Sequence, residues 1–243
     1  MRKWMTYSSI LSILMVWYVV YLVVDHPLLM PSIEDTFLAL MRLFGSRDAL
    51  LAIAHTFVRL GISIGISLLL AFIMTYLSYQ YKHIEAFIEP YIVLLKTIPL
   101  VSVILVIYVL IHFSLATYAI TFLMVFPLLY QAIFSGLQAI DSSYIDVYRL
   151  EKGSFYQGVK YLYWPMIQPY LILGLLQSLG LGLKVIVMAE FITQYRNGIG
   201  RLLYQARTNL AYDQIFAITI LLVVSTFLIE SQIKRWNHSI QNK

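Results

Sequence analysis

Residues 141–165, DSSYIDVYRLEKGSFYQGVKYLYWP, form a polar interruption between two long apolar segments of the chain. The interruption contains an imperfect capping box at 143–146 (Ser-x-x-Asp) and a full one at 154–157 (Ser-x-x-Gln), with Gly153 well placed to end the first helix. Most connections between elements are shorter and contain no helices of their own. We therefore expect a helix–glycine–helix projection at a membrane face, which we name the 141–165 loop.

The composition places the chain among membrane proteins with several spans. Of its 243 residues, 60% are hydrophobic and only 12% are charged, whereas soluble domains carry about 25% charged residues. The chain has no cysteine, which excludes disulfides, thiolate metal sites and a cysteine nucleophile. No small-residue cleavage site follows the first apolar run, so we expect that run to be kept as a span.

Six apolar stretches are long enough to cross a membrane, which takes about 20 residues in a helix. They lie near residues 7–24, 52–79, 87–111, 117–137, 166–190 and 214–233. Residues 28–48 instead alternate apolar and charged positions, which predicts a short helix on the external membrane surface that starts near Pro31. Pro99 and Pro127 lie inside the third and fourth stretches and predict kinks there.

Positive charge predicts the orientation of these spans, because cytoplasmic segments carry more lysine and arginine than external ones. With six spans, both termini and the 141–165 loop share one side. That side carries Arg2, Lys3, Lys82, Arg149, Lys152, Lys160, Lys234, Arg235 and Lys243, and the opposite side carries Arg42, Arg47, Arg196, Arg201 and Arg207. We therefore expect both termini and the loop to be cytoplasmic.

Several charged residues lie within or at the edges of the apolar stretches, namely Arg59, Lys96, Lys184 and Glu190. A charge at the centre of a bilayer costs at least about 2.5–3.5 kcal/mol, so such residues face protein or a water-filled path unless they reach the headgroups. We expect Arg59 to reach the headgroups. Lys184 and Glu190 are expected to face inward without pairing with each other. The candidate residues of a translocation path or gate are Lys96, Pro99, Lys184 and Glu190.

The sequence contains no catalytic or nucleotide-binding motif. There is no HExxH pair, no GxSxG turn and no GxxxxGK[ST] phosphate loop, and the five histidines are scattered without ligand spacing. No nucleic-acid-binding module is visible either, so no nucleic-acid partner is expected. We therefore expect a chain that is not an enzyme and binds no cofactor or metal. If ATP drives its activity, another subunit must bind the nucleotide.

The 141–165 loop has two interpretations that its residues leave open. It is either a docking element for a soluble partner or an amphipathic connection that rests on the headgroups. Docking would use the charges of Arg149, Glu151 and Lys152 to pair across an interface. Ile145, Leu150 and Phe155 would fill an apolar groove of the partner, as in other helix-in-groove complexes.

Four further motifs are spread along the chain. A proline-containing segment reads LLMPSIEDT at 28–36, and an H-x-S-x-x-R-like motif reads HTFVRL at 55–60. A second proline element covers 90–100, and an AE…GIG motif places Glu190 before GIGRL at 198–202. Together these motifs resemble the permease subunit of bacterial ABC importers, in the branch that transports nitrate, sulfonates and taurine. The resemblance covers nearly the whole chain.

The most specific feature of that family is a cytoplasmic loop with the pattern E-A-A-x-x-x-G, followed by a hydrophobic residue, any residue, leucine and proline. Gly153 and residues 162–165 (LYWP) fit this frame, but the positions of the small residues hold Val, Tyr and Arg at 147–149. The nearest acid, Asp146, lies one position before the glutamate of the pattern. Trp164 replaces the leucine before the proline, and the spacing from Gly153 to this ending is one residue shorter than in the family pattern. The resemblance therefore implies a coupling element with altered partner contacts.

The resemblance implies an all-α fold with six transmembrane helices, the type I ABC importer permease fold, in a single transmembrane domain over 1–243. It implies a multi-pass protein of the bacterial cytoplasmic membrane that works as a permease dimer, with ATPase subunits that bind ATP and a solute-binding protein outside. Movement of the loop would switch the spans between inward-facing and outward-facing states. The ATPase-coupling residues would be Asp146, Arg149, Leu150, Glu151, Lys152, Gly153 and Ser154.

Two other functions compete with this one. A stand-alone secondary carrier would use Lys184 and Glu190 as ion-coupling groups, but no clear inverted repeat is found. A non-transporting membrane-assembly protein is the other alternative. The substrate also stays open, because the branch imports nitrate, alkanesulfonates, taurine and vitamin precursors such as hydroxymethylpyrimidine or riboflavin. In this family the external binding protein sets most of that selectivity.

Overall fold

The computed structural model is built from helices and turns in the residues that it describes, which are 2–26, 29–111, 113–150 and 154–241. The elements are α1 (Arg2–Val24), α2 (Ile33–Gly45), α3 (Arg47–Gln80), α4 (Lys82–Thr97), α5 (Leu100–Leu110), α6 (Phe113–Gln138), α7 (Ser142–Leu150), α8 (Phe155–Gly158), the π-helical turn η1 (Val159–Tyr163), α9 (Trp164–Thr193), α10 (Ile199–Thr208) and α11 (Tyr212–Gln241). The expected all-α fold is confirmed.

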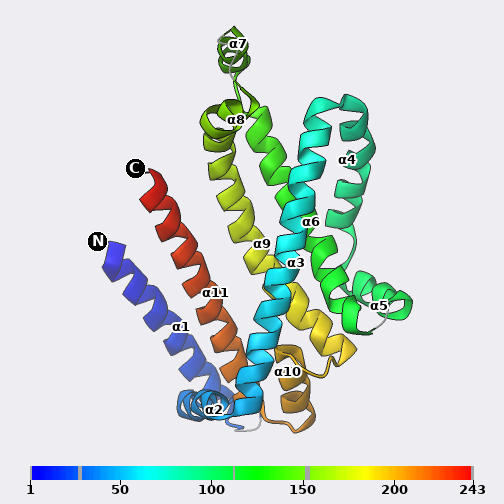
Figure 1. The fold of residues 1–243 in the computed structure, drawn as a ribbon. Coiled ribbons are helices and arrows are strands. Elements are labelled where there is room, and N and C mark those ends of the chain that lie inside the picture. Colours follow the sequence, from blue (N-terminus) through cyan, green and yellow to red (C-terminus); the bar gives the residue numbers. More distant parts are fainter. Residues whose placement is uncertain (1, 27–28, 112, 151–153, 242–243) are drawn as a thin grey trace.

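Three long helices, α3, α6 and α9, pack together and form the core of the bundle (Figure 1). Their buried faces carry large aliphatic side chains, among them Leu60 of α3, Leu129 of α6 and Ile186 of α9. The helices approach closely at Gly182 of α9, where an added Cβ would lie 2.9 Å from Leu60 Cδ1. Small residues at such contacts favour helix packing in membranes, because apolar burial alone gains little against lipid.

Five helices are long and apolar enough to cross a membrane in the described part of the chain, and the α4–α5 pair adds a sixth crossing if it is one span. The bend at Pro99 is larger than the expected kink, because α4 and α5 meet at 105°. Pro99 explains the break. It has no backbone N–H, and the preceding Ile98 takes an extended conformation (φ −63°, ψ 132°). Pro127, in contrast, lies inside α6, which continues past it.

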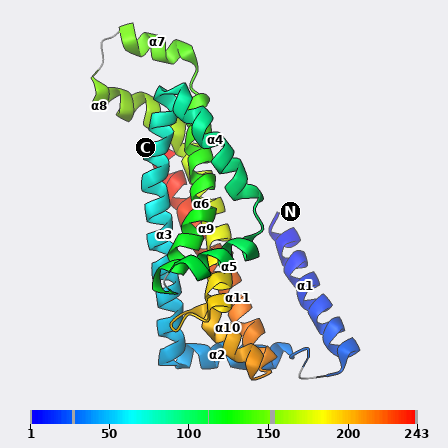
Figure 2. The same ribbon diagram turned by 90° about the vertical axis from the view of Figure 1, so that its right-hand side faces the viewer.

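The first two helices lie at the periphery of the bundle. α1 runs along its outside, and α2 lies across one of its ends (Figure 2). α2 starts where the sequence predicts, because Asp35 N donates to the Ser32 Oγ cap at 3.0 Å. Trp17 holds α1 in place: its indole Nε1 donates to the Pro31 carbonyl at 3.1 Å, and its ring lies 5.2 Å from that of Phe216 in α11.

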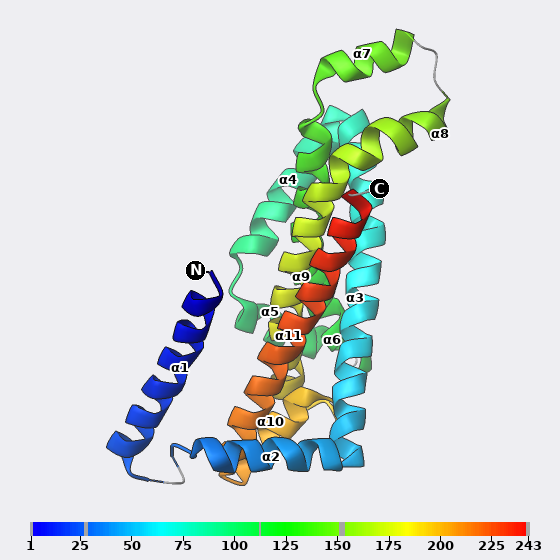
Figure 3. The same ribbon diagram turned by 90° about the vertical axis from the view of Figure 1, so that its left-hand side faces the viewer.

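The bundle has two distinct ends (Figure 3). One end carries α7 and α8, and we call it the loop end. The other carries α2 and α10, and we call it the α10 end. α1 and α11 both direct their chain termini toward the loop end (Figure 1), which fits an even number of crossings. The sequence did not predict α10, because its residues are too few and too polar for a span and follow a glycine.

Candidate functional site

Asp141 caps the first helix of the 141–165 loop. The Ser143 backbone N–H donates to Asp141 Oδ1 at 2.8 Å, and α7 begins at Ser142. The predicted cap at Ser143 is therefore placed too late. This hydrogen bond holds the pKa of the Asp141 carboxyl below its usual range, because it favours the charged form. The cap is fully present above the ordinary pKa of aspartate and is lost as the pH falls through the lowered value.

Ser154 and Gln157 form the second capping box as predicted. Ser154 N donates to Gln157 Oε1 at 2.9 Å, and Gln157 N donates to Ser154 Oγ at 3.4 Å. The fifth apolar stretch, expected near 166–190, does not begin a helix of its own. Instead, α8, η1 and α9 follow one another without a break from 155 to 193. Figure 3 shows this path bending at the base of the loop, where the π-helical turn lies.

Tyr148 joins the two helices of the loop to each other. Its hydroxyl donates to the Ser154 carbonyl oxygen at 2.7 Å. Its ring covers Gly158, where an added Cβ would lie 2.7 Å from the ring carbon Cζ. Tyr148 stands where the family pattern has a small residue, and Gly158 opposite it leaves room for the tyrosine ring. As a result, α7 and α8 are held together within one preassembled unit.

The outer face of α7 carries an apolar stripe. Leu150 is 82% exposed, and Tyr144 and Val147 are exposed at three-residue spacing along the same helix. Three exposed apolar residues on one helical face are typical of a helix that inserts into a partner's groove. The other expected coupling residues are either exposed (Asp146 and Ser154) or have side chains outside the described part of the chain (Arg149, Glu151, Lys152 and Gly153).

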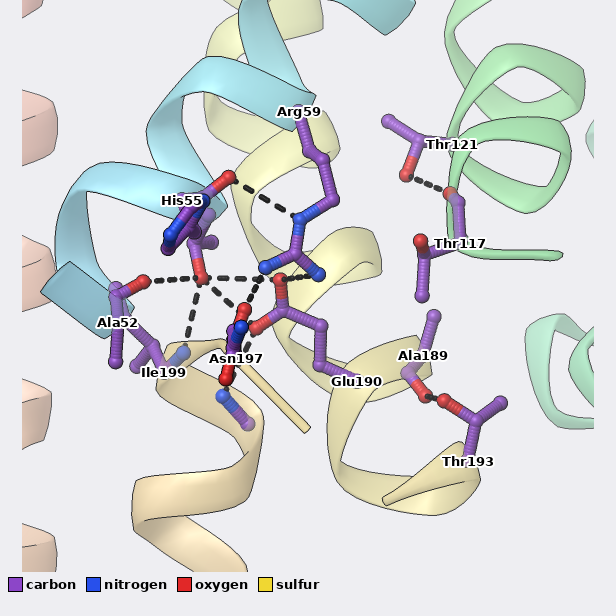
Figure 4. Close-up of polar contacts among 12 residues, drawn as sticks. Ala52, His55, Arg59, Thr117, Thr121, Ala189, Glu190, Thr193, Asn197 and Ile199 are labelled. Atoms are coloured by element: carbon purple, nitrogen blue, oxygen red, sulfur yellow. Dashed lines mark hydrogen bonds and ion pairs between the residues drawn. The ribbon is translucent and has the colours of Figure 1, made fainter. Parts of the chain in front are cut away.

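Arg59 and Glu190 form a buried ion pair near the α10 end of the bundle (Figure 4). Arg59 Nη1 lies 2.9 Å from Glu190 Oε1, and the two side chains are 4% and 0% exposed. The guanidinium also donates to the carbonyl oxygens of His55 and Asn197. It lies 4.3 Å from the centre of the Tyr195 ring. The expectation that Arg59 reaches the headgroups is wrong, because its polar partners all lie inside the protein.

Thr56 and the first turn of α10 complete this site. Thr56 Oγ1 lies 2.9 and 3.0 Å from the two Glu190 carboxylate oxygens. Ile199 N donates to Thr56 Oγ1 at 2.9 Å, and Gly200 N donates to Glu190 Oε2 at 3.0 Å. The first N–H groups of a helix have no hydrogen-bond partner within their own helix. Here Thr56 of α3 and Glu190 of α9 accept these hydrogen bonds from α10. We name Thr56, Arg59, Glu190, Ile199 and Gly200 the Arg59–Glu190 cluster. It fixes α10 against α3 and α9.

The cluster joins two motifs that are far apart in the sequence. The HTFVRL motif supplies Thr56 and Arg59, and the AE…GIG motif supplies Glu190 and the start of α10. The sequence could not show that these motifs meet, because Thr56 and Glu190 are separated by 134 positions. The signal that it did contain was two charges of opposite sign in apolar stretches, each of which needs a partner in a membrane.

Gly200 lies so close to α9 that a side chain does not fit. An added Cβ would overlap Glu190 Cβ and the Phe191 amide, and it would lie 2.6 Å from the Val187 carbonyl oxygen. Backbone atoms cannot rotate away, so helix α10 would have to move. We expect Gly200→Ala to lower the free energy of unfolding by about 1–3 kcal/mol. The melting temperature of the purified protein in detergent measures this loss.

Gly61→Ala is the matched control for that substitution. Nothing lies within 4 Å of a Cβ added at Gly61, and alanine favours a helix over glycine. We therefore expect this variant to melt at or above the temperature of the unmodified protein. Equal melting temperatures for the two alanine variants would contradict the close approach of α10 to α9.

Lys184 lies away from the Arg59–Glu190 cluster. It is exposed on α9 and lines an open cavity of about 830 Å³ between α9, α10 and α11, which we name the α9–α11 groove. Arg207 of α10 and Glu230 of α11 are the other charged residues of its lining, and the remainder is mainly apolar. The groove is therefore a mainly apolar cavity with three charged lining residues, two of them positive.

The other two expected path residues lie near the broken third span. Lys96, in the last turn of α4, is exposed and donates to Gln131 Oε1 at 2.7 Å. Pro99 forms the break before α5. The structure therefore does not gather the four expected path residues at one point. Glu190 belongs to the Arg59–Glu190 cluster, Lys184 to the groove, and Lys96 and Pro99 to the end of α4.

Most of the chain matches a known family of membrane proteins. Residues 61–238 match the family described as the binding-protein-dependent transport system inner membrane component. The fold is similar to that of a chain in a structure entitled "Inward facing conformations of the MetNI methionine ABC transporter: CY5 native crystal form". That likeness has a TM-score of 0.65 and 15% sequence identity, and it covers 80% of this chain and 99% of the other. It confirms the fold expected of a type I importer permease.

A curated relative shares sequence similarity over part of its length. A protein of Bacillus subtilis (strain 168) named as an aliphatic sulfonates transport permease protein, SsuC, is 24% identical over 168 residues. The match covers 66% of this chain and 60% of the relative, so the chain spans less than two thirds of that protein.

Proposed function

The chain belongs to the family of inner-membrane components of binding-protein-dependent transport systems, and we propose that it forms the path by which an ATP-driven importer carries a small organic anion across the membrane. As a permease it is not an enzyme, and a separate ATPase subunit hydrolyses the ATP. We propose that residues 1–243 act as one transmembrane domain with both termini and the 141–165 loop in the cytoplasm.

The observation that carries this proposal is the 141–165 loop. It projects from one end of the bundle and is held together by Tyr148, and α7 displays the apolar stripe that ends at Leu150. The sequence has no phosphate-binding loop, so a transporter built on this chain takes its energy from a partner. The ATPase subunit is the partner that the stripe fits, because a helix with exposed apolar residues binds in a hydrophobic groove.

Two features favour an organic anion as the transported solute. The α9–α11 groove contains the cationic Lys184 and Arg207, which attract an anion, while its apolar residues suit an alkyl chain. The sulfonate named for the Bacillus subtilis relative has this chemistry. We propose a sulfonate of this kind, with nitrate and taurine as related alternatives. A vitamin precursor such as a pyrimidine or riboflavin fits the charged residues less well.

The groove also favours a dimer. It opens on a side of the single chain and is lined by α9, α10 and α11 alone. We propose that a second copy of the permease closes it, so that the path lies between the two copies. An external solute-binding protein would deliver the anion at the α10 end, and the ATPase would bind at the loop end.

Uptake of radiolabelled ethanesulfonate by vesicles that contain the complete transporter tests this function. We expect uptake to require ATP and the binding protein. Lys184→Gln is expected to reduce uptake about tenfold, because a positive charge that lines a cleft raises the local concentration of an anion by that order or more. Lys82→Gln is the matched control, since Lys82 is exposed and pairs with Glu85 away from the groove.

Two results would overturn the proposal in different ways. Uptake that proceeds without ATP and without a bound ATPase would identify a stand-alone carrier. Absence of both uptake and a co-purifying ATPase would favour a membrane-assembly protein. Uptake of the neutral ethyl methyl sulfone as readily as of ethanesulfonate would contradict the choice of an anion.

A further inference from the structure

A second cavity lies at the α10 end, separate from the α9–α11 groove. It has a volume of about 320 Å³ and is enclosed by the start of α3, the 194–198 turn and the first half of α10. Its polar lining includes Asp48, His55, Arg196, Arg201 and Gln205. We name it the vestibule. α10 lies between the vestibule and the groove, because residues of the same helix line both.

The two arginines make the vestibule positively charged. Arg201 is half-buried, and its Nη1 donates to the Arg196 carbonyl oxygen at 3.1 Å, which orients the guanidinium along the turn. No carboxylate in the described part of the chain forms an ion pair with Arg196 or Arg201. Asp48 supplies the only negative charge among the described lining residues. The two arginines and Asp48 together give the lining one excess positive charge.

The buried charges beneath the vestibule do not cancel this excess. Glu190 is paired with Arg59, so the Arg59–Glu190 cluster contributes a neutral pair. The N–H groups at the start of α10 are also occupied. Ile199 N donates to Thr56, Gly200 N donates to Glu190, and Arg201 N donates to the Gly198 carbonyl. An anion in the vestibule would therefore be bound by the arginine side chains, not by the helix terminus.

We propose that the vestibule is a binding site for the anionic head group of the transported solute, with Arg196 and Arg201 as its ligands. The guanidinium group suits a sulfonate because its N–H donors form parallel hydrogen bonds to two oxygens. This inference rests on the proposed function, which places the α10 end outside the cell. The vestibule would bind the anion before it reaches Arg207 and Lys184 on the other side of α10.

The absence of cysteine from the sequence allows a direct test. Gln205 lines the vestibule and is exposed, so Gln205→Cys gives the protein one reactive thiol beside the two arginines. The probes are 2-sulfonatoethyl methanethiosulfonate, which is an anion, and its trimethylammonioethyl counterpart, a cation. In intact cells we measure how fast each probe modifies the thiol and divide the rate for the anionic probe by the rate for the cationic probe. We expect this ratio to be about tenfold higher for Gln205→Cys than for Phe37→Cys, an exposed reference position on α2.

Charge substitutions make the test specific to the vestibule. In the Gln205→Cys background, Arg196→Gln combined with Arg201→Gln is expected to abolish the anion preference. Asp48→Asn is expected to raise the anion preference. Arg42→Gln removes an arginine elsewhere at the α10 end and is expected to leave the anion preference unchanged. Ethanesulfonate is expected to slow modification by uncharged methyl methanethiosulfonate, whereas ethyl methyl sulfone is not.

The outcomes separate this inference from the proposed function. An anion preference that is absent, or that survives loss of both arginines, would overturn the vestibule site even if ATP-dependent uptake is normal. Protection by ethyl methyl sulfone equal to that by ethanesulfonate would also overturn it. Failure of the uptake experiment would instead contradict the transported anion, because thiol modification is measured without any transport.

Discussion

Replacing Glu190 with glutamine is expected to lower the free energy of unfolding by about 3–5 kcal/mol, because it leaves Arg59 buried without a counter-charge. Only 4% of the Arg59 side chain is exposed, and its other partners are two backbone carbonyls and the Tyr195 ring. These dipoles do not replace a full negative charge. We expect a lower melting temperature for the purified protein in detergent and a smaller folded fraction in membranes.

A double substitution distinguishes a buried charge from a simple loss of packing. Arg59→Met with Glu190→Gln removes both charges, so we expect it to regain most of the stability that Glu190→Gln loses. The control is the exposed Lys234–Glu230 pair, 3.3 Å apart with side chains 63% and 31% exposed. Glu230→Gln should cost no more than about 1 kcal/mol. Equal stability of the Glu190 and Glu230 variants would contradict a structural role for the buried pair.

Leu150→Glu is expected to disconnect the permease from its ATPase. Burying an unpaired carboxylate in the partner's groove weakens binding by about tenfold or more, so the ATPase should be lost on purification and ATP-dependent uptake should fall. Because Leu150 is 82% exposed, the variant should fold and melt like the unmodified protein. Leu150→Met keeps an apolar side chain of similar volume and should retain both properties.

Leu29→Glu is the control for that experiment. Leu29 is an exposed leucine four residues before α2, and α2 lies at the opposite end of the bundle from α7 (Figure 3). We expect it to keep the ATPase, since the same change in charge occurs far from the loop. If Leu150→Glu retains the ATPase and transports normally, the 141–165 loop is not the docking element.

The sequence predicted the features that depend on local patterns. Apolar length placed the spans, the Ser154–Gln157 box opened the second helix of the loop, and Ser32 capped α2, because each depends on residues a few positions apart. Pro99 indicated a change of direction but not its size. A missing N–H permits a break, and the 105° between α4 and α5 is set by how the two helices pack on the bundle.

The buried site was beyond the reach of sequence reasoning for a different reason. Arg59 lies within reach of a span end by position, so an isolated helix would let it extend to the headgroups. Only tertiary packing places Glu190, Tyr195 and the Asn197 carbonyl around its guanidinium. α10 was missed likewise, because its first turn is stabilised by Thr56 and Glu190 from other helices rather than by a cap of its own.

Site-specific cross-linking at Leu150 tests most directly whether the loop couples this permease to an ATPase. The chain has no natural cysteine, so Leu150→Cys carries one benzophenone-maleimide label in membranes that contain the whole transporter. We predict an adduct with a protein that contains a GxxxxGK[ST] phosphate loop and hydrolyses ATP, and no such adduct from Leu29→Cys. An adduct that is absent, or that forms equally from both positions, would contradict the account.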